Sequence, residues 1–240
     1  MSAPTILIED WKGGYHNSSD YQARLLKERA YQDLSTICLV PTRGVIPARV
    51  VTSWWGLMTP MNQKFIRMLV SGYEVGKAYS TAIDNILANP DLSQWKYVLT
   101  LEEDNIPPPD GLLKLYENMD KYDAIGGLYW TKGPGGQPMC YGRADQFPRN
   151  FIPQIPNPEG LTPCNGLGMG FTLFKMEMFK DARLPRPLFE TKQVYEPGKG
   201  SQCYTQDLKF FEEAGKLGYK FACDSRVKVG HYDLTNDIVW

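Results

Sequence analysis

Three consecutive carboxylates follow directly after a short apolar run in the middle of the chain. Residues 97–101 are rich in β-forming side chains, and Glu102, Glu103 and Asp104 come next, before three prolines at 107–109. The run predicts a buried parallel strand. Because buried charges are unfavourable, we expect the acids where the strand emerges, at the carboxyl edge where α/β sheets bind ligands. Two interpretations stay open: a divalent metal that carries a phosphate, or a solvated acidic loop.

Two isolated residues further along the chain could belong to the same site. Asp207 lies in the first turn of a predicted helix over 205–218, with Thr205 as the expected cap, and His231 follows the apolar segment 226–229. Taken alone, an acid at a helix start is explained by the helix dipole, and a lone histidine by a surface position. Their order relative to the carboxylates is therefore what matters.

Strands and helices are expected to alternate along most of the chain. This alternation predicts an α/β protein with a mostly parallel, doubly wound, Rossmann-like sheet. The predicted strands are 35–41, 65–70, 97–101, 123–130, an apolar segment within 161–174, 220–223 and 226–229. The predicted helices are 21–34, 47–55, 74–87, 111–119 with Asp110 as cap, 175–179 and 205–218.

The composition describes an ordinary globular protein of 240 residues with a formal net charge of −1. Near-neutral charge argues against a general nucleic-acid binder. No apolar stretch is long enough to span a membrane, and the first ten residues lack the features of a signal peptide. The five cysteines are scattered without paired spacing. This favours reduced thiols in a cytoplasmic protein over a disulfide scaffold or a zinc site.

The chain is expected to form one domain over residues 35–240, preceded by an N-terminal extension over 1–34. Within the domain, residues 131–163 are rich in proline, glycine and asparagine and predict a long irregular loop. Residues 184–203 predict a second loop. Loops of such length in a compact domain are usually functional. With His16 and His231 as the only histidines, neither a hydrolase triad nor a multi-histidine metal centre is expected.

Taken in order, these motifs resemble the A-type fold glycosyltransferases. A nucleotide-like first strand and loop come first, followed by a strand that ends in acid-x-acid and then by a glycine-rich strand. Next come an acid at a helix start and a strand that ends in Val-Gly-His. The resemblance runs from about residue 35 to His231 and is closest to the family 2-like branch, in particular to small phage and viral members. It implies the A-type fold, with a smaller mixed region on the acceptor side.

The resemblance implies transfer of a sugar from a nucleotide diphosphate sugar with the help of Mn²⁺ or Mg²⁺. Asp104 and His231 match metal ligands of the family, and Glu102 matches the first acid of the motif, which is usually Asp. A shell of carboxylate and imidazole suits Mn²⁺ better than Ca²⁺. Asp207 matches the general base of inverting members, although Gln206 stands where relatives have Glu.

Other positions match substrate contacts of the family. The implied donor contacts are Pro41, Thr42, Arg43, Ser71, Gly72 and Glu103. The implied acceptor contacts are Trp130, Asn165 and Gly166. Residues 35–130 would then form the nucleotide-sugar half and residues 131–240 the acceptor half. Trp130 could stack on a sugar or base, or pack in the core. Residues 78–80 depart from the Arg-Asn that relatives often carry, so the donor is not predicted from them.

Several functional interpretations stay open. The near-neutral charge favours a glycan over a hydroxymethylated base of phage DNA as the acceptor. A sugar-phosphate nucleotidyltransferase would share the architecture, but it usually carries a glycine-rich basic loop that residues 41–44 do not match. A non-catalytic module that binds nucleotide sugars or glycans is the third interpretation. The motifs leave the sugar, the nucleotide, the stereochemistry and the oligomeric state open.

Overall fold

The computed structural model describes residues 32–196, 198 and 200–240. The predicted N-terminal extension and the helix expected over 21–34 therefore lie outside the described residues, apart from residues 32–34. Within the described part of the chain, no helix combines the length and the apolar character needed to cross a membrane.

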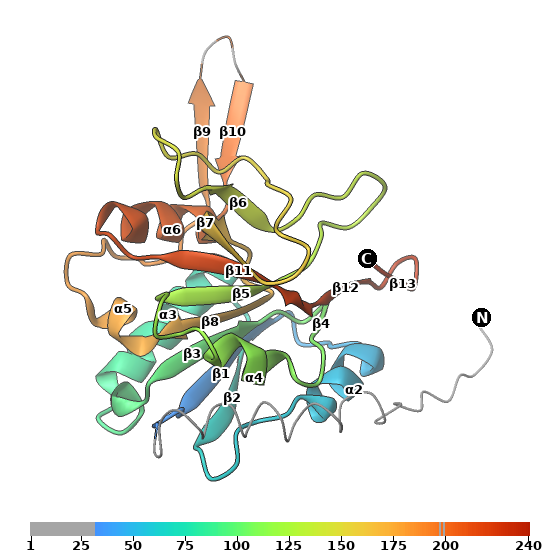
Figure 1. The fold of residues 1–240 in the computed structure, drawn as a ribbon, viewed down its shortest axis with the longest axis vertical. Coiled ribbons are helices and arrows are strands. Elements are labelled where there is room, and N and C mark those ends of the chain that lie inside the picture. The colour runs from blue at the N-terminus through green and yellow to red at the C-terminus, as the bar shows by residue number, and fades with distance from the viewer. Residues whose placement is uncertain (1–31, 197, 199) are drawn as a thin grey trace.

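A large mixed sheet forms the centre of the molecule (Figure 1). Among the described residues it has eight strands in the order β2-β1-β3-β8-β5-β11-β7-β6. From the pairing directions, only β8 and β7 run opposite to the other strands. The expectation of a mostly parallel sheet is thus confirmed. The strands are β1 (Thr36–Thr42), β2 (Phe65–Ser71), β3 (Tyr97–Leu101), β5 (Ala124–Leu128), β6 (Cys140–Arg143), β7 (Leu161–Leu167), β8 (Phe171–Lys175) and β11 (Phe221–Lys228).

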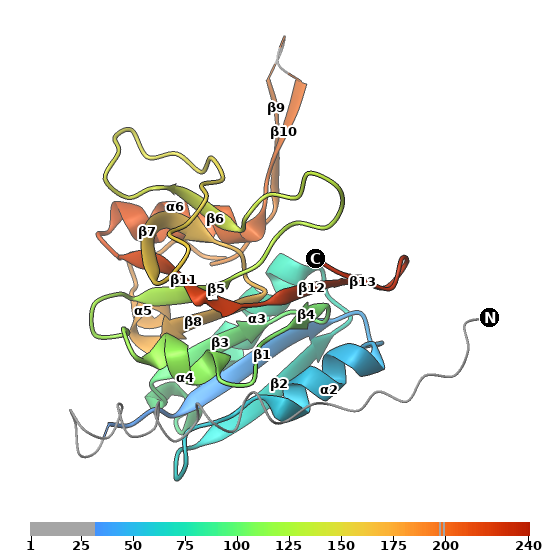
Figure 2. The same cartoon turned by 45° about the vertical axis from the view of Figure 1, so that its right-hand side comes forward.

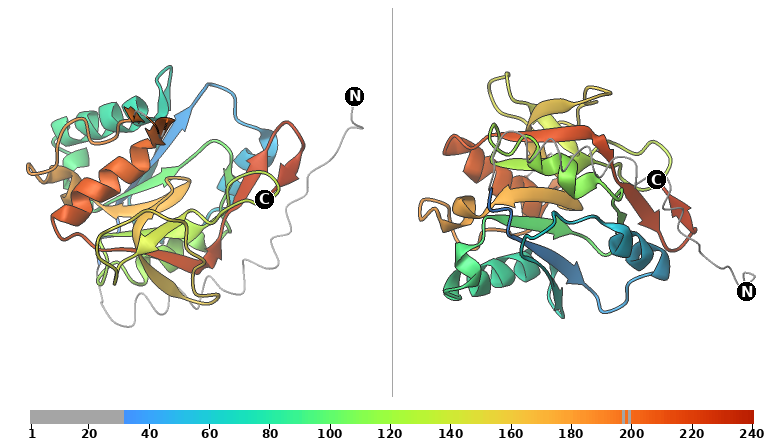
Figure 3. Two further views of the ribbon diagram at one scale, coloured as in Figure 1. Left: turned by 90° about the horizontal axis from the view of Figure 1, so that it is seen from above. Right: turned by 60° about the horizontal axis from the view of Figure 1, so that its bottom comes forward.

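Helices cover both faces of this sheet, as the doubly wound prediction requires. Helices α3, α5 and α6 pack on one face, and α2 and α4 pack on the other. Figure 3 shows α3 in teal and α6 in orange on the same side of the strands. The helices are α2 (Ala48–Gly56), α3 (Val75–Ala88), α4 (Gly111–Tyr116), α5 (Met176–Lys180) and α6 (Gln206–Lys216), with a 3₁₀ turn over Leu92–Gln94.

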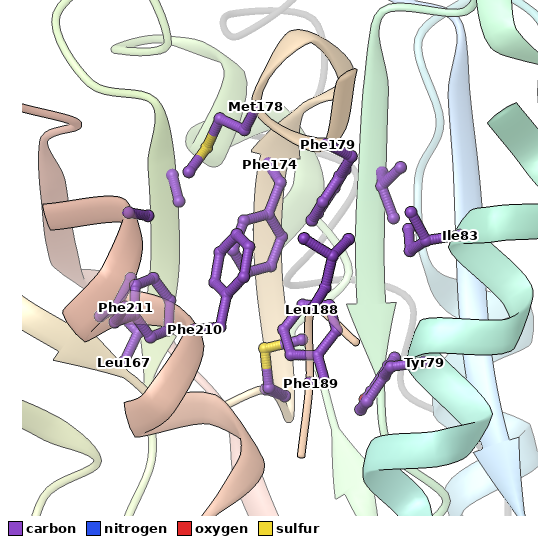
Figure 4. Close-up of a cluster of buried hydrophobic side chains, with 14 of the residues drawn as sticks. Tyr79, Ile83, Leu167, Phe174, Met178, Phe179, Leu188, Phe189, Phe210 and Phe211 are labelled. Carbon is purple, nitrogen blue, oxygen red and sulfur yellow. The ribbon is translucent and has the colours of Figure 1, made fainter. Parts of the chain in front are cut away.

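Alternating side chains of the central strands fill the two cores. In β1, Ile37 and Leu39 join one core, whereas Cys38 and Val40 join the other. Every residue of β1 and β3 is buried, which explains their continuous apolar character. Figure 4 shows the core under α3 and α6, where phenylalanines from β8, α5 and α6 pack against one another. These cores hold the strands whose ends carry the candidate site.

A small three-stranded sheet lies at the carboxyl end of β3. It consists of β4 (Asn105–Ile106), β12 (Gly230–Asp233) and β13 (Ile238–Val239), in the order β13-β12-β4. Strand β12 continues the path of β11 and runs antiparallel to β4 (Figure 2). The end of the chain thereby folds back beside the carboxylate motif.

Several predicted details are wrong. The region 131–163 contains strand β6, and the region 184–203 contains an antiparallel hairpin, β9 (Lys192–Glu196) and β10 (Gly200–Tyr204), which projects from the body in Figure 1. The two strands expected over 220–229 are one strand, β11. Asp110 and Thr205 occupy the cap positions of α4 and α6, but neither side chain makes a capping hydrogen bond. Asp110 instead pairs with Lys114 at 2.9 Å.

Candidate active site

Asp104 and His231 lie side by side, although they are 127 positions apart in the sequence. The backbone brings them together, because His231 pairs with Asn105 between β12 and β4, and Tyr232 N donates to the Asp104 carbonyl at 2.7 Å. Nε2 of His231 lies 3.4 Å from Oδ2 of Asp104. The spacing of the two side chains is therefore set by main-chain hydrogen bonds.

A lysine shares the same carboxylate oxygen. Nζ of Lys132 lies 2.5 Å from Oδ2 of Asp104. Burial on its own would raise the pKa of the Asp104 carboxyl, but hydrogen bonds and charges from His231 and Lys132 outweigh it and lower the pKa to about 2. Asp104 is thus an anion at neutral pH and a strong attractor of cations.

A hydrogen bond to a main-chain carbonyl fixes the orientation of the His231 ring. Nδ1 lies 2.7 Å from the carbonyl oxygen of Trp130. Since a carbonyl only accepts hydrogen bonds, Nδ1 carries the proton in this contact and Nε2 points at Asp104. The ring also meets Tyr129 edge-on, with the centroids 5.5 Å apart. A backbone carbonyl behind the ring is the usual support of a metal-binding histidine.

Glu103 connects the carboxyl ends of β3 and β1. Its Oε2 accepts hydrogen bonds from Thr42 Oγ1 at 2.7 Å and from Arg43 N at 2.9 Å, and its Oε1 forms an ion pair with the Arg43 side chain. The residue is only 8% exposed. Both oxygens of Glu103 therefore contact the first-strand loop and position it, and the donor contact expected from the sequence stays a prediction.

Glu102, the first acid of the motif, makes a hydrogen bond with Tyr79 of α3. Tyr79 OH donates to its Oε1 at 3.4 Å. The pKa of Glu102 is raised to about 8. Burial of the carboxyl group is the largest cause, and the nearby charges of Asp104 and Asp207 add to it. Within the residues that the structure describes, no three His, Cys, Asp or Glu side chains gather as a metal site. The role of Glu102 as a third ligand therefore stays a prediction.

Asp207 lies at the start of α6, close enough to Glu102 for the two carboxyl groups to interact electrostatically. The residue is 5% exposed, and its Oδ1 accepts a hydrogen bond from Leu208 N at 2.9 Å. Burial raises the pKa of Asp207, and hydrogen bonds from Thr205 and the backbone offset this only in part. A carboxylate with a raised pKa is suited to accept a proton.

The remaining donor candidates lie along the same edge. Thr42 at the end of β1 pairs with Ser71 at the end of β2, and Pro41 pairs with Val70. Gly72 follows with a φ of 84°, a left-handed conformation that glycine adopts without strain. The structure thus brings the predicted donor residues together at the carboxyl ends of adjacent parallel strands, where α/β sheets bind ligands.

Comparison with solved structures identifies the architecture. A197 from STIV superposes with a TM-score of 0.57 at 19% identity, covering 83% of this chain and 86% of that chain. GalNAc-T7, solved with UDP, GalNAc and Mn²⁺, superposes with a TM-score of 0.53 at 12% identity and covers 83% of this chain. The match spans 44% of the GalNAc-T7 chain. In sequence, no family model and no curated protein matches the chain.

The chain has the A-type glycosyltransferase fold. The expectation drawn from the order of the sequence motifs is thereby confirmed for the fold.

The Asp104–His231 pair fits the divalent ion that the A-type glycosyltransferase fold implies. Adjacent ligands of an octahedral ion with bonds of about 2.1 Å are about 3.0 Å apart, close to the observed 3.4 Å. One carboxylate and one imidazole form a suitable donor set for Mn²⁺, and the Trp130 carbonyl orients the imidazole through its Nδ1. With two protein ligands, the remaining coordination positions would be open to water and to phosphate oxygens.

Two of the three predicted acceptor residues have structural contacts in this A-type fold. Asn165 is 5% exposed, and its Nδ2 donates to the carbonyl of Asn150 at 3.0 Å. A Cβ on Gly166 would meet the Phe151 ring at 3.0 Å. The acceptor contacts expected of Asn165 and Gly166 stay predictions. Trp130 is 37% exposed beside the site, which favours a surface role over core packing.

The sequence motifs single out neither Lys132 nor Tyr129. Lys132 follows the end of a predicted strand on the carboxyl edge, and that position was the available signal. Tyr129 is 2% exposed and packs in the core. Its hydroxyl also accepts a hydrogen bond from Gly170 N at 2.8 Å while its ring packs on His231. Tyr129 therefore links β5 to the histidine.

Replacing Glu103 with glutamine is expected to destabilise the fold by about 2 kcal/mol. Glutamine keeps only one acceptor oxygen, so its amide nitrogen must face either the donors Thr42 Oγ1 and Arg43 N or the Arg43 guanidinium, and it can accept from none of them. Urea denaturation would measure the loss. Glu177→Gln is the control, because its partner Lys180 lies on an exposed helix surface, and we expect a change of under about 0.5 kcal/mol there. Equal stability of the two variants would contradict the anchoring role.

Proposed function

We propose that the protein is a metal-dependent glycosyltransferase that moves a sugar from a uridine diphosphate sugar to an acceptor hydroxyl. The observation that carries this proposal is the pairing of Asp104 with Nε2 of His231, 3.4 Å apart, at the carboxyl edge of an A-type sheet. The structural neighbour GalNAc-T7 was solved with UDP, GalNAc and Mn²⁺, which supports both the donor class and the metal. Mn²⁺ or Mg²⁺ bound there would neutralise the charge that develops on the leaving diphosphate.

The donor occupies the edge formed by residues 35–130 in this proposal. Thr42, Arg43, Ser71 and Gly72 lie together there, and Pro41 gives the end of β1 a fixed backbone angle. The Arg43 side chain is 88% exposed even though it pairs with Glu103, so its remaining guanidinium donors face solvent and are free to meet phosphate oxygens. Glu103 holds this loop in place for the nucleotide.

Asp207 is the proposed general base on the acceptor side, residues 131–240. It accepts the proton of the attacking hydroxyl while the bond between the sugar and the diphosphate breaks on the opposite face of the sugar ring. This arrangement gives inversion at the anomeric carbon. Gln206 next to it adds no negative charge, whereas a glutamate at that position would disfavour the ionised form of Asp207.

The acceptor in this proposal is a glycan, favoured over a hydroxymethylated DNA base by the net charge of −1. Trp130 borders the site with an exposed ring, and aromatic faces stack well on sugars.

A panel of nucleotide sugars, each incubated with Mn²⁺, tests the proposal. We expect release of the nucleoside diphosphate from a UDP-sugar, faster when an oligosaccharide acceptor is added. A nucleotidyltransferase would instead consume sugar phosphate and nucleoside triphosphate and release pyrophosphate. Binding of the nucleotide sugar without release of UDP, with every acceptor tested, would identify a binding module and contradict the proposal.

On acidification, we expect the transfer rate to fall at a higher pH than it would if the base were an aspartate with an unshifted pKa. The base must be ionised, and burial raises the pKa of Asp207. Its ionised fraction therefore falls while the solution is still above the usual aspartate range of about 4. The measurement is kcat/KM against pH, with UDP affinity and circular dichroism followed over the same range. A rate that stays constant down to about pH 4 would argue against Asp207 as the base.

A further inference from the structure

The ammonium group of Lys132 lies where it would compete with a metal ion for Asp104. Its Nζ lies 2.5 Å from Oδ2, the same oxygen that faces Nε2 of His231. Oδ2 of Asp104 therefore faces both Lys132 and His231. An ion bound between this oxygen and Nε2 of His231 would lie at contact distance from the ammonium group, and two cations so close repel each other strongly.

The segment that carries Lys132 is held in place on both sides. Before it, the Trp130 carbonyl meets His231 Nδ1 at 2.7 Å. After it, Thr131 N donates to the Gln137 carbonyl at 2.9 Å, and Gln137 N donates to Thr131 Oγ1 at 2.8 Å, which closes a short loop. The backbone thus keeps the lysine beside the site, while its flexible four-carbon stem lets the ammonium group change partners.

We propose that Lys132 is a tethered counter-ion of Asp104 that a divalent ion displaces, and that the displaced ammonium group then binds the diphosphate of the donor. This inference rests on the proposed function. In the absence of metal, Lys132 neutralises Asp104. Once the carboxylate is taken by the ion, the released ammonium group is available to the negatively charged phosphates of the donor.

The first test measures metal affinity without any nucleotide. Mn²⁺ is titrated into the full-length protein, and free Mn²⁺ is followed by electron paramagnetic resonance. Lys132→Met is expected to bind Mn²⁺ about tenfold more tightly than the wild type, because the ion no longer displaces a salt bridge or meets a positive charge. Lys132→Arg keeps the cation and is expected to stay near the wild-type affinity.

The second test measures UDP affinity at saturating Mn²⁺ by calorimetry. Here Lys132→Met is expected to bind UDP about tenfold more weakly, since a charge-assisted contact is lost. The two affinities therefore change in opposite directions, which general damage to the site would not produce. Unchanged Mn²⁺ affinity in Lys132→Met, or weaker binding of both ligands, would overturn the inference.

The chain offers a matched control in Lys175. It pairs with Asp123 at 3.0 Å, and this pair has the same side-chain exposures, 32% and 24%, as the Lys132–Asp104 pair. It lies at the opposite end of the sheet, where β8 ends and β5 begins. Lys175→Met is expected to change neither affinity. A Mn²⁺ affinity gain equal to that of Lys132→Met would show a non-specific charge effect and contradict the proposal.

These measurements separate the inference from the proposed function. If the wild type transfers sugar but the Lys132 variants bind Mn²⁺ and UDP normally, the counter-ion role is wrong and the enzyme assignment stands. If the wild type binds neither Mn²⁺ nor UDP, both are wrong.

Discussion

Replacing Asp104 with asparagine is expected to abolish Mn²⁺-dependent binding of UDP. The amide keeps the shape of the side chain but loses the charge that pairs with Lys132 and faces His231. Losing a supporting partner of a metal ligand already costs 10- to 100-fold in affinity, so removal of the anionic ligand itself should cost about 100-fold or more. Calorimetric titration of UDP with and without Mn²⁺ would measure the difference.

Asp123→Asn is the matched control for this variant. Asp123 is also paired with a lysine and has the same side-chain exposure of 24%, but it lies at the other end of the sheet. The control should bind UDP like the wild type. Wild-type affinity in the Asp104 variant, in the presence of Mn²⁺, would remove Asp104 from the metal site and with it the central support of the proposed function.

Replacing Asp207 with asparagine is expected to leave donor binding intact and to lower the rate of transfer by about 10²- to 10⁴-fold, the usual contribution of a general base. Asparagine is nearly isosteric, and its carbonyl oxygen can still accept from Leu208 N. The variant should therefore fold normally but be unable to take the proton of the acceptor. Single-turnover rates and UDP affinity, measured together, separate the two effects.

Glu212→Gln serves as the control for Asp207, because it lies in the same helix and makes an exposed ion pair with Lys216. Its transfer rate should equal that of the wild type. The anomeric configuration of the product, read by nuclear magnetic resonance, tests the same residue independently, and we expect inversion. Full turnover by the Asp207 variant would exclude it as the base and favour a retaining mechanism.

Much of the architecture was predictable because local pattern and tertiary environment agree. The strand over 97–101 is found at its predicted bounds, since an uninterrupted apolar run that is buried on both faces has few alternatives. The order of acid motif, glycine-rich strand and terminal histidine was sufficient to indicate the A-type fold. Helix α3 likewise begins one residue after its predicted start, where Glu74 accepts a hydrogen bond from Lys77 N.

The elements that escaped prediction depend on partners far away in sequence. Strand β6 is four residues long and exists because β7 pairs with it, and the hairpin β9–β10 lies within residues 184–203, whose prolines and glycines predict a loop. In the site, the engagement of Glu103 by the β1 loop and of Asp104 by Lys132 cannot be inferred from spacing. Each involves a charge pair across 28 or more positions.

The pairing of β4 with β12 has a consequence for how such sequences diverge. Main-chain atoms alone align Asp104 with His231, so the spacing of the two side chains does not require particular neighbours in the surrounding loops. Substitutions can accumulate along the rim, and with them new sugar or acceptor preferences, while the geometry of the pair is preserved. Sequence identity can then fall to the level of chance between proteins that still place an aspartate and a histidine side by side at this edge.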